Sequence, residues 1–231
     1  MSTVVDRPQP SVPLTGLSPH LGRTAGAVWF LLLALLYAGG APSLVRAAQG
    51  AGLSFAAWAP VVSRGCTMAF FVTLAWLMLA RPTAVARRSN PVTLMIALAG
   101  TYGVWLVAFL PQAPLPPSLT VLSAAMTLVG SALIIYTVLH LGRSFSIAPQ
   151  ARELVTRGPY ALVRHPLYAA EEIALVGVAM HVAWYAALPF LAVHLALQIK
   201  RMNYEEQLLR EVFPRYAAYA GRTARWVPSL W

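Results

Sequence analysis

The chain has 231 residues, of which 58% are hydrophobic and only 10% are charged, and its mean hydropathy is +0.64. The hydrophobic content is higher than in ordinary soluble proteins and predicts an all-α integral membrane protein. The net charge of +10 does not indicate nucleic-acid binding, because the cations stand at the ends of apolar runs, where anionic lipid headgroups are expected. Membrane lipids are therefore expected around the protein, and a nucleic-acid partner is not.

Acidic residues are confined to the C-terminal part of the sequence. Apart from Asp6, every carboxylate lies between Glu153 and Glu211. The apolar segments before Glu153 thus contain no acid for a proton relay or cation pathway, which argues against an ion-coupled transporter. The single cysteine, Cys66, permits no intrachain disulfide, and no pair of Cys or His residues has the spacing of metal ligands, so no metal site is predicted.

The first 140 residues are predicted to form a tail followed by four transmembrane helices. Residues 1–22 are polar and rich in proline, which predicts a loosely ordered N-terminal tail. Residues 23–140 contain four apolar runs that approach the roughly 20 residues needed to cross a bilayer. These runs are Ala25 to Ala41, Pro60 to Ala80, Val92 to Leu110 and Ser118 to Leu139. The first run resembles a signal peptide, but the long proline-rich segment before it favours a retained helix.

Charges in the loops predict the orientation. The loop ARPTAVARRSNP between the second and third runs has three arginines, whereas PQAPLPPS between the third and fourth has no charge. The positive-inside rule places the Arg-rich loop and the N-terminus in the cytoplasm, although Arg46 and Arg64 in the first external loop run against it. After four crossings, the segment from Leu141 onward is expected to begin on the cytoplasmic side.

Residues 141–231 are predicted to form a charged loop, for which the family resemblance described below implies cofactor binding, then a helical hairpin and a C-terminal amphipathic helix. One straight helix over Leu167 to Ile199 would be about 50 Å long, well beyond a hydrocarbon core of about 30 Å. Two shorter helices that turn near His181 to Trp184 avoid this mismatch and keep the later arginines inside. Beyond Lys200, the sequence RMNYEEQLLREVF predicts a helix that ends before Pro214. The prediction is therefore six spans with both termini cytoplasmic. The richness of the chain in Ala and Arg is typical of bacterial proteins, so the membrane is expected to be a bacterial inner membrane.

Folding the predicted hairpin brings two charged clusters together. The first contains Arg164, His165, Tyr168, Glu171 and Glu172, and the second contains Arg201, Glu205 and Glu206. Taken alone, Arg201 and Glu205 are also compatible with a surface ion pair at i, i+4 spacing, and His165 with a structural histidine. Together, the cations and carboxylates at a membrane boundary suit a zwitterionic small molecule whose reaction partner arrives from the lipid. The sequence has neither GxGxxG nor GxxxxGK[ST], so a nucleotide-like cofactor would need a different kind of site.

Two motifs in this part resemble a known family. LVTRGPYALVRHPLY, followed after the hairpin by RMNYEEQLLREVFPRYAAYAGRTARWVP, is similar to the isoprenylcysteine carboxyl methyltransferase (ICMT) family and its bacterial members, and LGRSFS at residues 141–146 is also similar to many of them. The resemblance covers about the last 90 residues. It implies an integral-membrane methyltransferase that uses S-adenosylmethionine, with Arg201 and Glu205 as catalytic residues. The cofactor-binding residues that it implies are Leu154, Gly158, Pro159, Tyr160, Arg164, His165, Pro166, Tyr168 and Glu205.

The methyl acceptor is expected to be soluble in the membrane and to enter from the bilayer. A carboxylate such as a prenylcysteine-like or isoprenoid acid is the first expectation, and a small thiol or a phospholipid amine is an alternative. A membrane reductase of the sterol-reductase type that uses NADPH is a second kind of function, which the pairing of RHPxY with RxxxEE disfavours. The sequence departs from the family pattern at Ala170 and Pro214, where glycine is usual, and neither change removes a charged group.

Overall fold

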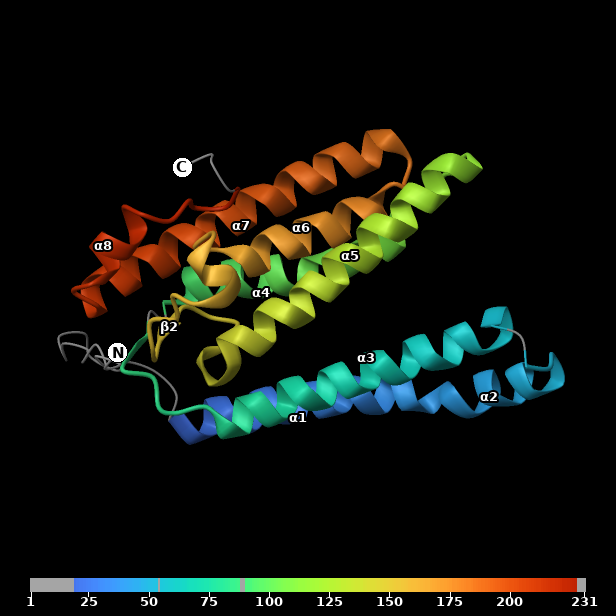
Figure 1. Ribbon diagram of the computed structural model, residues 1–231, viewed down its shortest axis with the longest axis horizontal. Coiled ribbons are helices and arrows are strands. Elements are labelled where there is room, and N and C mark those ends of the chain that lie inside the picture. The colour runs from blue at the N-terminus through green and yellow to red at the C-terminus, as the bar shows by residue number, and fades with distance from the viewer. Residues whose placement is uncertain (1–18, 54, 88–89, 228–231) are drawn as a thin grey trace. The chain divides into compact units, whose positions relative to one another are not determined.

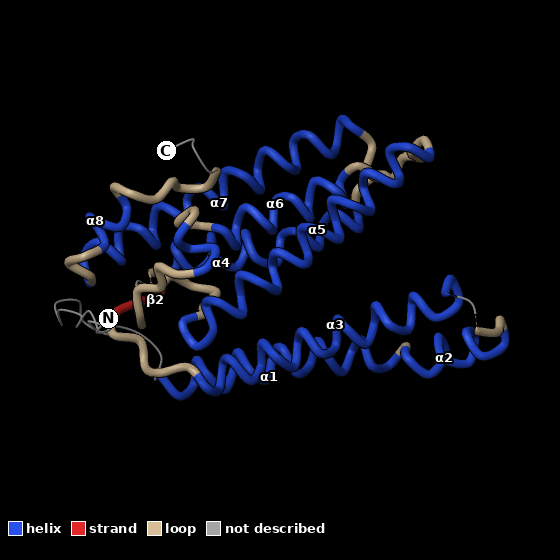
Figure 2. Tube along the Cα trace, viewed as in Figure 1, coloured by secondary structure: helices blue, strands red, loops and turns tan. Residues whose placement is uncertain are grey.

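The computed structural model describes residues 19–53, 55–87 and 90–227, which are helical over most of their length (Figures 1 and 2). Contacts divide the chain into two compact units, one over Leu17–Pro82 and one that contains every element from Thr83 onward. Most of the predicted N-terminal tail lies outside the described residues, and its last four residues already belong to the first helix.

The first unit consists of α1 (Pro19–Gly39), α2 (Ala41–Gly50) and α3 (Phe55–Ala80). Gly26 lets α1 approach α3 closely, because a Cβ atom at this position would lie 3.1 Å from Met78 Sδ. The rings of Phe30 and Phe71 stack across the same pair of helices with centroids 6.5 Å apart. Small residues and aromatic packing thus hold this apolar pair together, as is common between membrane helices.

The second unit is a bundle of helices with short loops at the end that carries α8 (Figure 1). Its α-helices are α4 (Pro91–Tyr102), α5 (Pro117–Leu141), α6 (Pro166–Ala179), α7 (Trp184–Val212) and α8 (Tyr216–Ala220). The short elements are the 3-10 helices η1 (Gly103–Phe109), η2 (Gly142–Ser144) and η3 (Gly158–Ala161), and the strands β1 (Ala86–Arg87) and β2 (Gln150–Ala151). Proline begins α4, α5 and α6, where its missing N–H has no helical partner to lose.

The helices α5 and α6 pack with their backbones close together. A Cβ atom at Gly130 on α5 would lie 2.4 Å from the backbone nitrogen of Ala174 on α6. Ser123 Oγ on α5 donates a hydrogen bond of 2.7 Å to the carbonyl of Gly177 on α6. Small residues on both helices therefore permit the contact, and the hydroxyl ties them together.

Among the residues that the structure describes, three segments are long and apolar enough to cross a membrane, namely Gly22–Gly50, Pro91–Phe109 and Pro117–Ser144, and the apolar segment Arg64–Ala80 is shorter. This agrees in part with the predicted all-α integral membrane protein of six spans: the described residues are mostly helical, and three segments reach the length of a span. Many of their large apolar side chains are exposed, including Leu36 on α1 at 73% and Leu128 on α5 at 72%, as expected for surfaces that face lipid. The 14 residues of α6 reach about 21 Å, less than a hydrocarbon core of about 30 Å.

The C-terminal helices differ from the prediction in one respect. The chain turns between Ala179 and Trp184, as the hairpin predicts, but no separate amphipathic helix follows Lys200. Instead, α7 continues without a break to Val212, because the residues after Ile199 are good helix formers and the first breaker is Pro214. The charged second motif is therefore carried rigidly on the same helix as the apolar hairpin segment. The two-residue pairing of β1 with β2 was not predicted either.

Candidate active site

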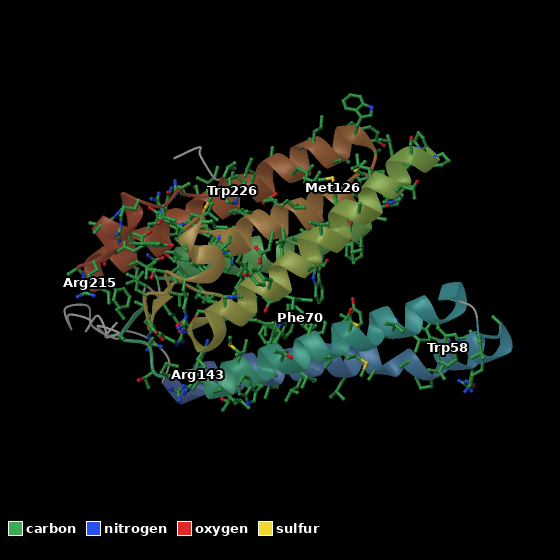
Figure 3. All side chains as sticks on the ribbon, viewed as in Figure 1. Trp58, Phe70, Met126, Arg143, Arg215 and Trp226 are labelled. Carbon is green, nitrogen blue, oxygen red and sulfur yellow. The ribbon has the colours of Figure 1, made fainter. Side chains whose placement is uncertain are left out.

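Polar side chains of the second unit gather at its α8 end, where Figure 3 shows most of the nitrogen and oxygen atoms. A cavity of about 130 Å³ lies among them. Its walls come from the end of α5 with η2 and the loop between η2 and η3, from residues 160–171, from α7 and α8, and from Thr101 of α4. The predicted site residues that line it are Leu154, Tyr160, Arg164, His165, Tyr168, Arg201 and Glu205. Both predicted halves of the site thus meet at one cavity.

Arg201 lies inside the protein instead of on the surface of α7, with only 4% of the residue exposed. Its Nη1 donates to Gln198 Oε1 at 2.7 Å, and the same nitrogen lies 3.7 Å from Glu171 Oε2. The guanidinium stands over the ring of Tyr168, with Cζ 4.6 Å from the ring centroid. A buried, stacked and paired arginine of this kind holds a fixed position and a fixed charge beside the cavity.

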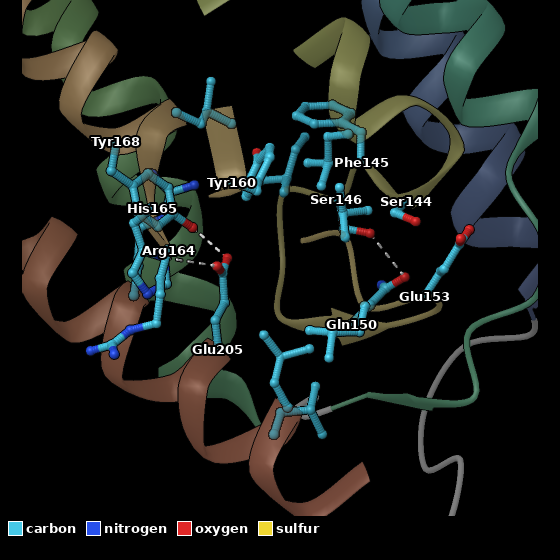
Figure 4. Close-up of a pocket in the computed structure, with 18 of the residues that line it drawn as sticks. Ser144, Phe145, Ser146, Gln150, Glu153, Tyr160, Arg164, His165, Tyr168 and Glu205 are labelled. Carbon is cyan, nitrogen blue, oxygen red and sulfur yellow. Dashed lines mark hydrogen bonds and ion pairs between the residues drawn. The ribbon is translucent and has the colours of Figure 1, made fainter. Parts of the chain in front are cut away.

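Glu205 faces the cavity from the next turn of α7, with 26% of its side chain exposed. Tyr168 Oη donates a hydrogen bond to Glu205 Oε1, and His165 Nδ1 lies 3.8 Å from Glu205 Oε2 (Figure 4). The rings of Tyr168 and His165 stack with their centroids 5.6 Å apart. The carboxylate is therefore oriented by the RHPxY segment and still accessible to a ligand.

Glu206, the second acid of the tandem, is the centre of an ion network that the sequence did not predict. Its Oε1 lies 3.1 Å from both Arg164 Nε and His165 Nε2 and 3.2 Å from Arg225 Nε, and its Oε2 lies 2.8 Å from Arg210 Nη2. Burial opposes its ionisation, but the hydrogen bond and charge of His165 and the charges of the arginines outweigh it and lower the pKa of Glu206 to about 2. Glu206 therefore joins the loop, α7 and the C-terminal segment as a permanent anion.

The predicted cofactor loop is also fixed to the C-terminal segment through the backbone. Arg164 N donates to Ala224 O at 2.8 Å, His165 N to Arg225 O at 3.1 Å, and Tyr219 Oη to Tyr160 O at 2.6 Å. Burial raises the pKa of Tyr219 to about 12; the charge of Arg164 opposes this, and the charge of Glu206 adds to it with a still smaller effect. The hydroxyl therefore remains a donor at neutral pH.

The side chain of Arg164 also binds the predicted cofactor loop to the C-terminal segment. Its Nη1 donates to the carbonyls of Ala220 and Thr223, while its Nε pairs with Glu206. Although Arg164 lines the cavity, its guanidinium is thus engaged in holding the C-terminal segment.

Gly158, Pro159 and Pro166 shape the loop and do not line the cavity. Gly158 has φ of +60°, and a Cβ atom there would lie 2.3 Å from the ring of His140 at the end of α5. Only glycine suits both the left-handed backbone and this close approach. Pro159 is buried in η3, and Pro166 begins α6. Ala170, where the family usually has glycine, is buried on α6 and does not line the cavity either.

The loop between η2 and η3 forms a second, polar wall of the cavity. Of its residues, only Leu154 was predicted from the sequence as part of the site. Ser144, Ser146, Gln150 and Glu153 line this side of the cavity, opposite Tyr168 and Glu205 (Figure 4). Arg152 donates to Ser146 and Gln150, and the pairing of β2 with β1 anchors the loop. The only signal for this wall in the sequence was LGRSFS, and that motif does not reveal which side chains face inward.

Comparison with known proteins finds a family match over the part of the chain that contains most of the cavity-lining residues. Residues 123–211 match the profile of the isoprenylcysteine carboxyl methyltransferase (ICMT) family, a range that runs from α5 nearly to the end of α7. The chain is 37% identical over 78 residues to the cobalt-zinc-cadmium resistance protein CzcN of Cupriavidus metallidurans, a match that covers 33% of this chain and 36% of that protein.

A second relative is the nickel-cobalt-cadmium resistance protein NccN of Alcaligenes xylosoxydans xylosoxydans, with 35% identity over 82 residues, or 35% of this chain and 38% of that protein. The matched part therefore spans little more than a third of the length of these two relatives. Among the described residues, no group of three or more His, Cys, Asp or Glu side chains is placed to hold a metal ion. Over residues 123–211, which contain Arg164, His165, Arg201 and Glu205, the chain carries a domain of the ICMT family.

Proposed function

We propose that this protein transfers a methyl group from S-adenosylmethionine to a membrane-soluble acceptor, in the first place a carboxylate such as a prenylcysteine-like or isoprenoid acid. The observation that carries this proposal is that His165 and Tyr168 of the first motif line the same cavity as Arg201 and Glu205 of the second, and that all four lie within the ICMT family domain.

The chemistry of the cavity fits the cofactor. S-adenosylmethionine presents an ammonium, a carboxylate, a ribose diol and an adenine ring. Glu205 provides an oriented acceptor for an ammonium or a diol, and the buried Nε of Arg201 has no partner among the described residues, so it can donate to a carboxylate. Tyr160, Tyr216 and Phe145 line the same cavity and offer ring surfaces for adenine.

The residues of the site suit a displacement that depends on alignment. When bound, S-adenosylmethionine would supply an electrophilic methyl group. A carboxylate acceptor would take this group without first losing a proton, as the bond between sulfur and the methyl carbon breaks and S-adenosylhomocysteine leaves. The protein must therefore orient the two partners and exclude water. Arg201, held by Gln198, Glu171 and the ring of Tyr168, supplies a fixed positive group for that orientation. With a thiol or amine acceptor, Glu205 or His165 would receive the proton.

The proposed placement in the membrane follows the loop charges. We propose six spans with α6 and α7 as the last two, and with both termini and the cavity on the cytoplasmic side. In this arrangement the charged end of α7 leaves the bilayer after Ile199, so that a soluble cofactor enters from the cytosol while a lipidic acceptor arrives between helices. Labelling of single cysteines introduced into the loops, in a Cys66→Ala background, with a membrane-impermeant reagent on intact cells tests this orientation.

The proposal is tested by ligand binding to the full chain, purified in nanodiscs. Titration calorimetry is expected to show binding of S-adenosylmethionine and none of NADPH. Arg201→Ala and Glu205→Gln are expected to weaken the binding at least tenfold, because each removes a group that faces the cavity. Lys200→Ala is the matched control, since this exposed neighbour of Arg201 does not line the cavity.

Binding of NADPH in place of S-adenosylmethionine would refute the proposed function and favour a reductase. Binding of S-adenosylmethionine that is the same in wild type, Arg201→Ala and Glu205→Gln would refute the assignment of the site. Transfer of a labelled methyl group into a total lipid extract then identifies the acceptor, and the alkaline lability of the labelled product distinguishes a methyl ester from methylated nitrogen or sulfur.

A further inference from the structure

The helix α4 lies outside residues 123–211 and yet reaches the cavity through Thr101. The neighbouring residue, Gly100, lies directly against Arg201, because a Cβ atom at Gly100 would be 2.6 Å from Arg201 Cδ and 3.4 Å from Gln198 Oε1. The side chain of Arg201 thus occupies space that any larger residue at position 100 would fill. This contact places α4 beside the part of Arg201 that carries Nε.

Two buried polar atoms at this place have no hydrogen-bond partner among the described residues. They are Nε of Arg201 and Oγ1 of Thr101, and both side chains line the cavity. Nη1 of Arg201 already donates to Gln198, whereas Nε–H is a further donor that has no acceptor among the described residues. Buried donors without partners are uncommon in proteins because they lose their hydrogen bonds to water. Because both side chains line the same cavity, the two unpartnered atoms indicate a ligand that carries oxygen.

The surroundings hold both groups in place. His194 on α7 has its Nε2 3.1 Å from the carbonyl of Gly100 and its Nδ1 2.6 Å from Glu172 Oε1 on α6. Gln198 Nε2 donates to Glu171 Oε2 at 2.7 Å, one residue earlier on α6. These bonds connect α4, α6 and α7 at the level of Arg201. The two unpartnered groups therefore belong to a preorganised wall, as a binding site requires.

We propose that Arg201 Nε and Thr101 Oγ1 form a two-point subsite for a carboxylate, and that Gly100 makes the subsite possible by leaving room for Arg201. The guanidinium supplies charge and one N–H, and the hydroxyl supplies a second donor, which matches the two oxygens of a carboxylate. This inference rests on the proposed function, and the carboxylate belongs either to the amino-acid part of S-adenosylmethionine or to an acidic methyl acceptor.

The first experiment removes only the hydroxyl, with Thr101→Val. The matched control is Thr93→Val on the same helix, because the Thr93 hydroxyl is also buried without a partner among the described residues but does not line the cavity. Binding is measured for two pairs of ligands that differ in the carboxylate. One pair is S-adenosylmethionine and its decarboxylated form, and the other is N-acetyl-S-farnesylcysteine and its amide.

Thr101→Val is expected to weaken binding of one acid by about tenfold and to leave its neutralised or decarboxylated partner unchanged, while Thr93→Val affects neither. The pair that responds identifies the source of the carboxylate. Equal affinities for wild type and Thr101→Val in both pairs, or equal losses for acid and partner, would overturn the subsite. If the wild type binds the farnesyl acid but not S-adenosylmethionine, the proposed function is refuted. The subsite is then still tested by the effect of Thr101→Val on binding of the farnesyl acid and its amide. Binding of neither acid would overturn both.

A second experiment needs no ligand. Gly100→Ala is expected to lower the melting temperature, whereas Gly103→Ala, with nothing within 4 Å of the added Cβ atom, is not. In an Arg201→Ala background, Gly100→Ala is expected to leave the melting temperature unchanged, because the added Cβ atom then occupies space that the Arg201 side chain filled. A loss of equal size in both backgrounds would show that Gly100 does not position Arg201.

Discussion

Glu206→Gln is expected to lower the stability of the protein in a way that depends on pH. The change keeps the size and shape of the side chain and removes its charge. In the folded protein this carboxylate is 5% exposed and faces Arg164, His165, Arg210 and Arg225. With glutamine, the three arginines lose their common anion. The loss is most costly at Arg164, because its side chain is only 10% exposed and a buried cation without its partner is destabilising.

The expected magnitude follows from the pKa of Glu206. The folded protein lowers it from an ordinary value of 4.5 to about 2, despite the opposing effect of burial. Each pH unit of separation between the folded and unfolded pKa corresponds to about 1.4 kcal/mol, so the ionised carboxylate contributes about 3 kcal/mol to the free energy of unfolding at pH 7. Because the folded pKa is lowered, this contribution is complete above the unfolded pKa and is lost as the pH falls from about 4.5 to about 2.

The assay is denaturant-induced unfolding of the wild type and the variant in an acid-stable detergent between pH 7 and pH 2. Glu206→Gln is expected to be less stable by about 3 kcal/mol at pH 7, and the difference is expected to shrink through the acid range. Glu211→Gln on the same helix is the control, because this residue is exposed and its change should alter stability by less than about 0.5 kcal/mol. A difference between wild type and Glu206→Gln that stays constant from pH 7 to pH 2 would refute the reasoning.

Further predictions concern the attachment of the loop and its turn. Tyr219→Phe leaves the carbonyl of Tyr160 without its 2.6 Å hydrogen bond and should lower the free energy of unfolding by about 1–3 kcal/mol in the same assay; no loss would mean that water replaces the hydroxyl. Gly158→Ala should cost more than Gly142→Ala, because both glycines have positive φ but only the Cβ at Gly158 meets the ring of His140. About 1–2 kcal/mol is expected for the strain alone and about 1–3 kcal/mol more for the clash, and equal costs would contradict the close contact.

The chemistry at the two ends of the hairpin could be predicted from local patterns. Pro166 begins α6, the chain turns near His181, and α7 returns Arg201 and Glu205 to the loop that contains His165. Each of these features depends on a helix breaker, an apolar run or a charge, and all three are properties of short stretches of sequence. The same patterns led to the resemblance to the ICMT family, which the profile match over residues 123–211 confirms.

The role of each charged residue within the two motifs could not be predicted from the sequence. Glu205 and Glu206 are adjacent and identical in type, yet Glu205 faces the cavity and Glu206 binds the loop and the C-terminal segment. Successive residues on a helix point about 100° apart, so the direction of each carboxylate depends on how α7 is rotated against its neighbours. For the same reason the sequence did not show that Arg164 would be engaged with Glu206 and backbone carbonyls.

The sequence by itself determined that the chain is apolar and helical, that its acids lie near the C-terminus, and which two motifs carry its chemistry, because composition and periodicity record these properties directly. Only the tertiary structure decided that Thr101 and Gly100 of α4 stand beside Arg201, and that the loop with Ser146 and Gln150 forms the opposite wall. These contacts join residues as many as 101 positions apart, from Gly100 to Arg201. Such pairs meet only when helix packing selects one arrangement, and no short pattern in the sequence specifies that choice.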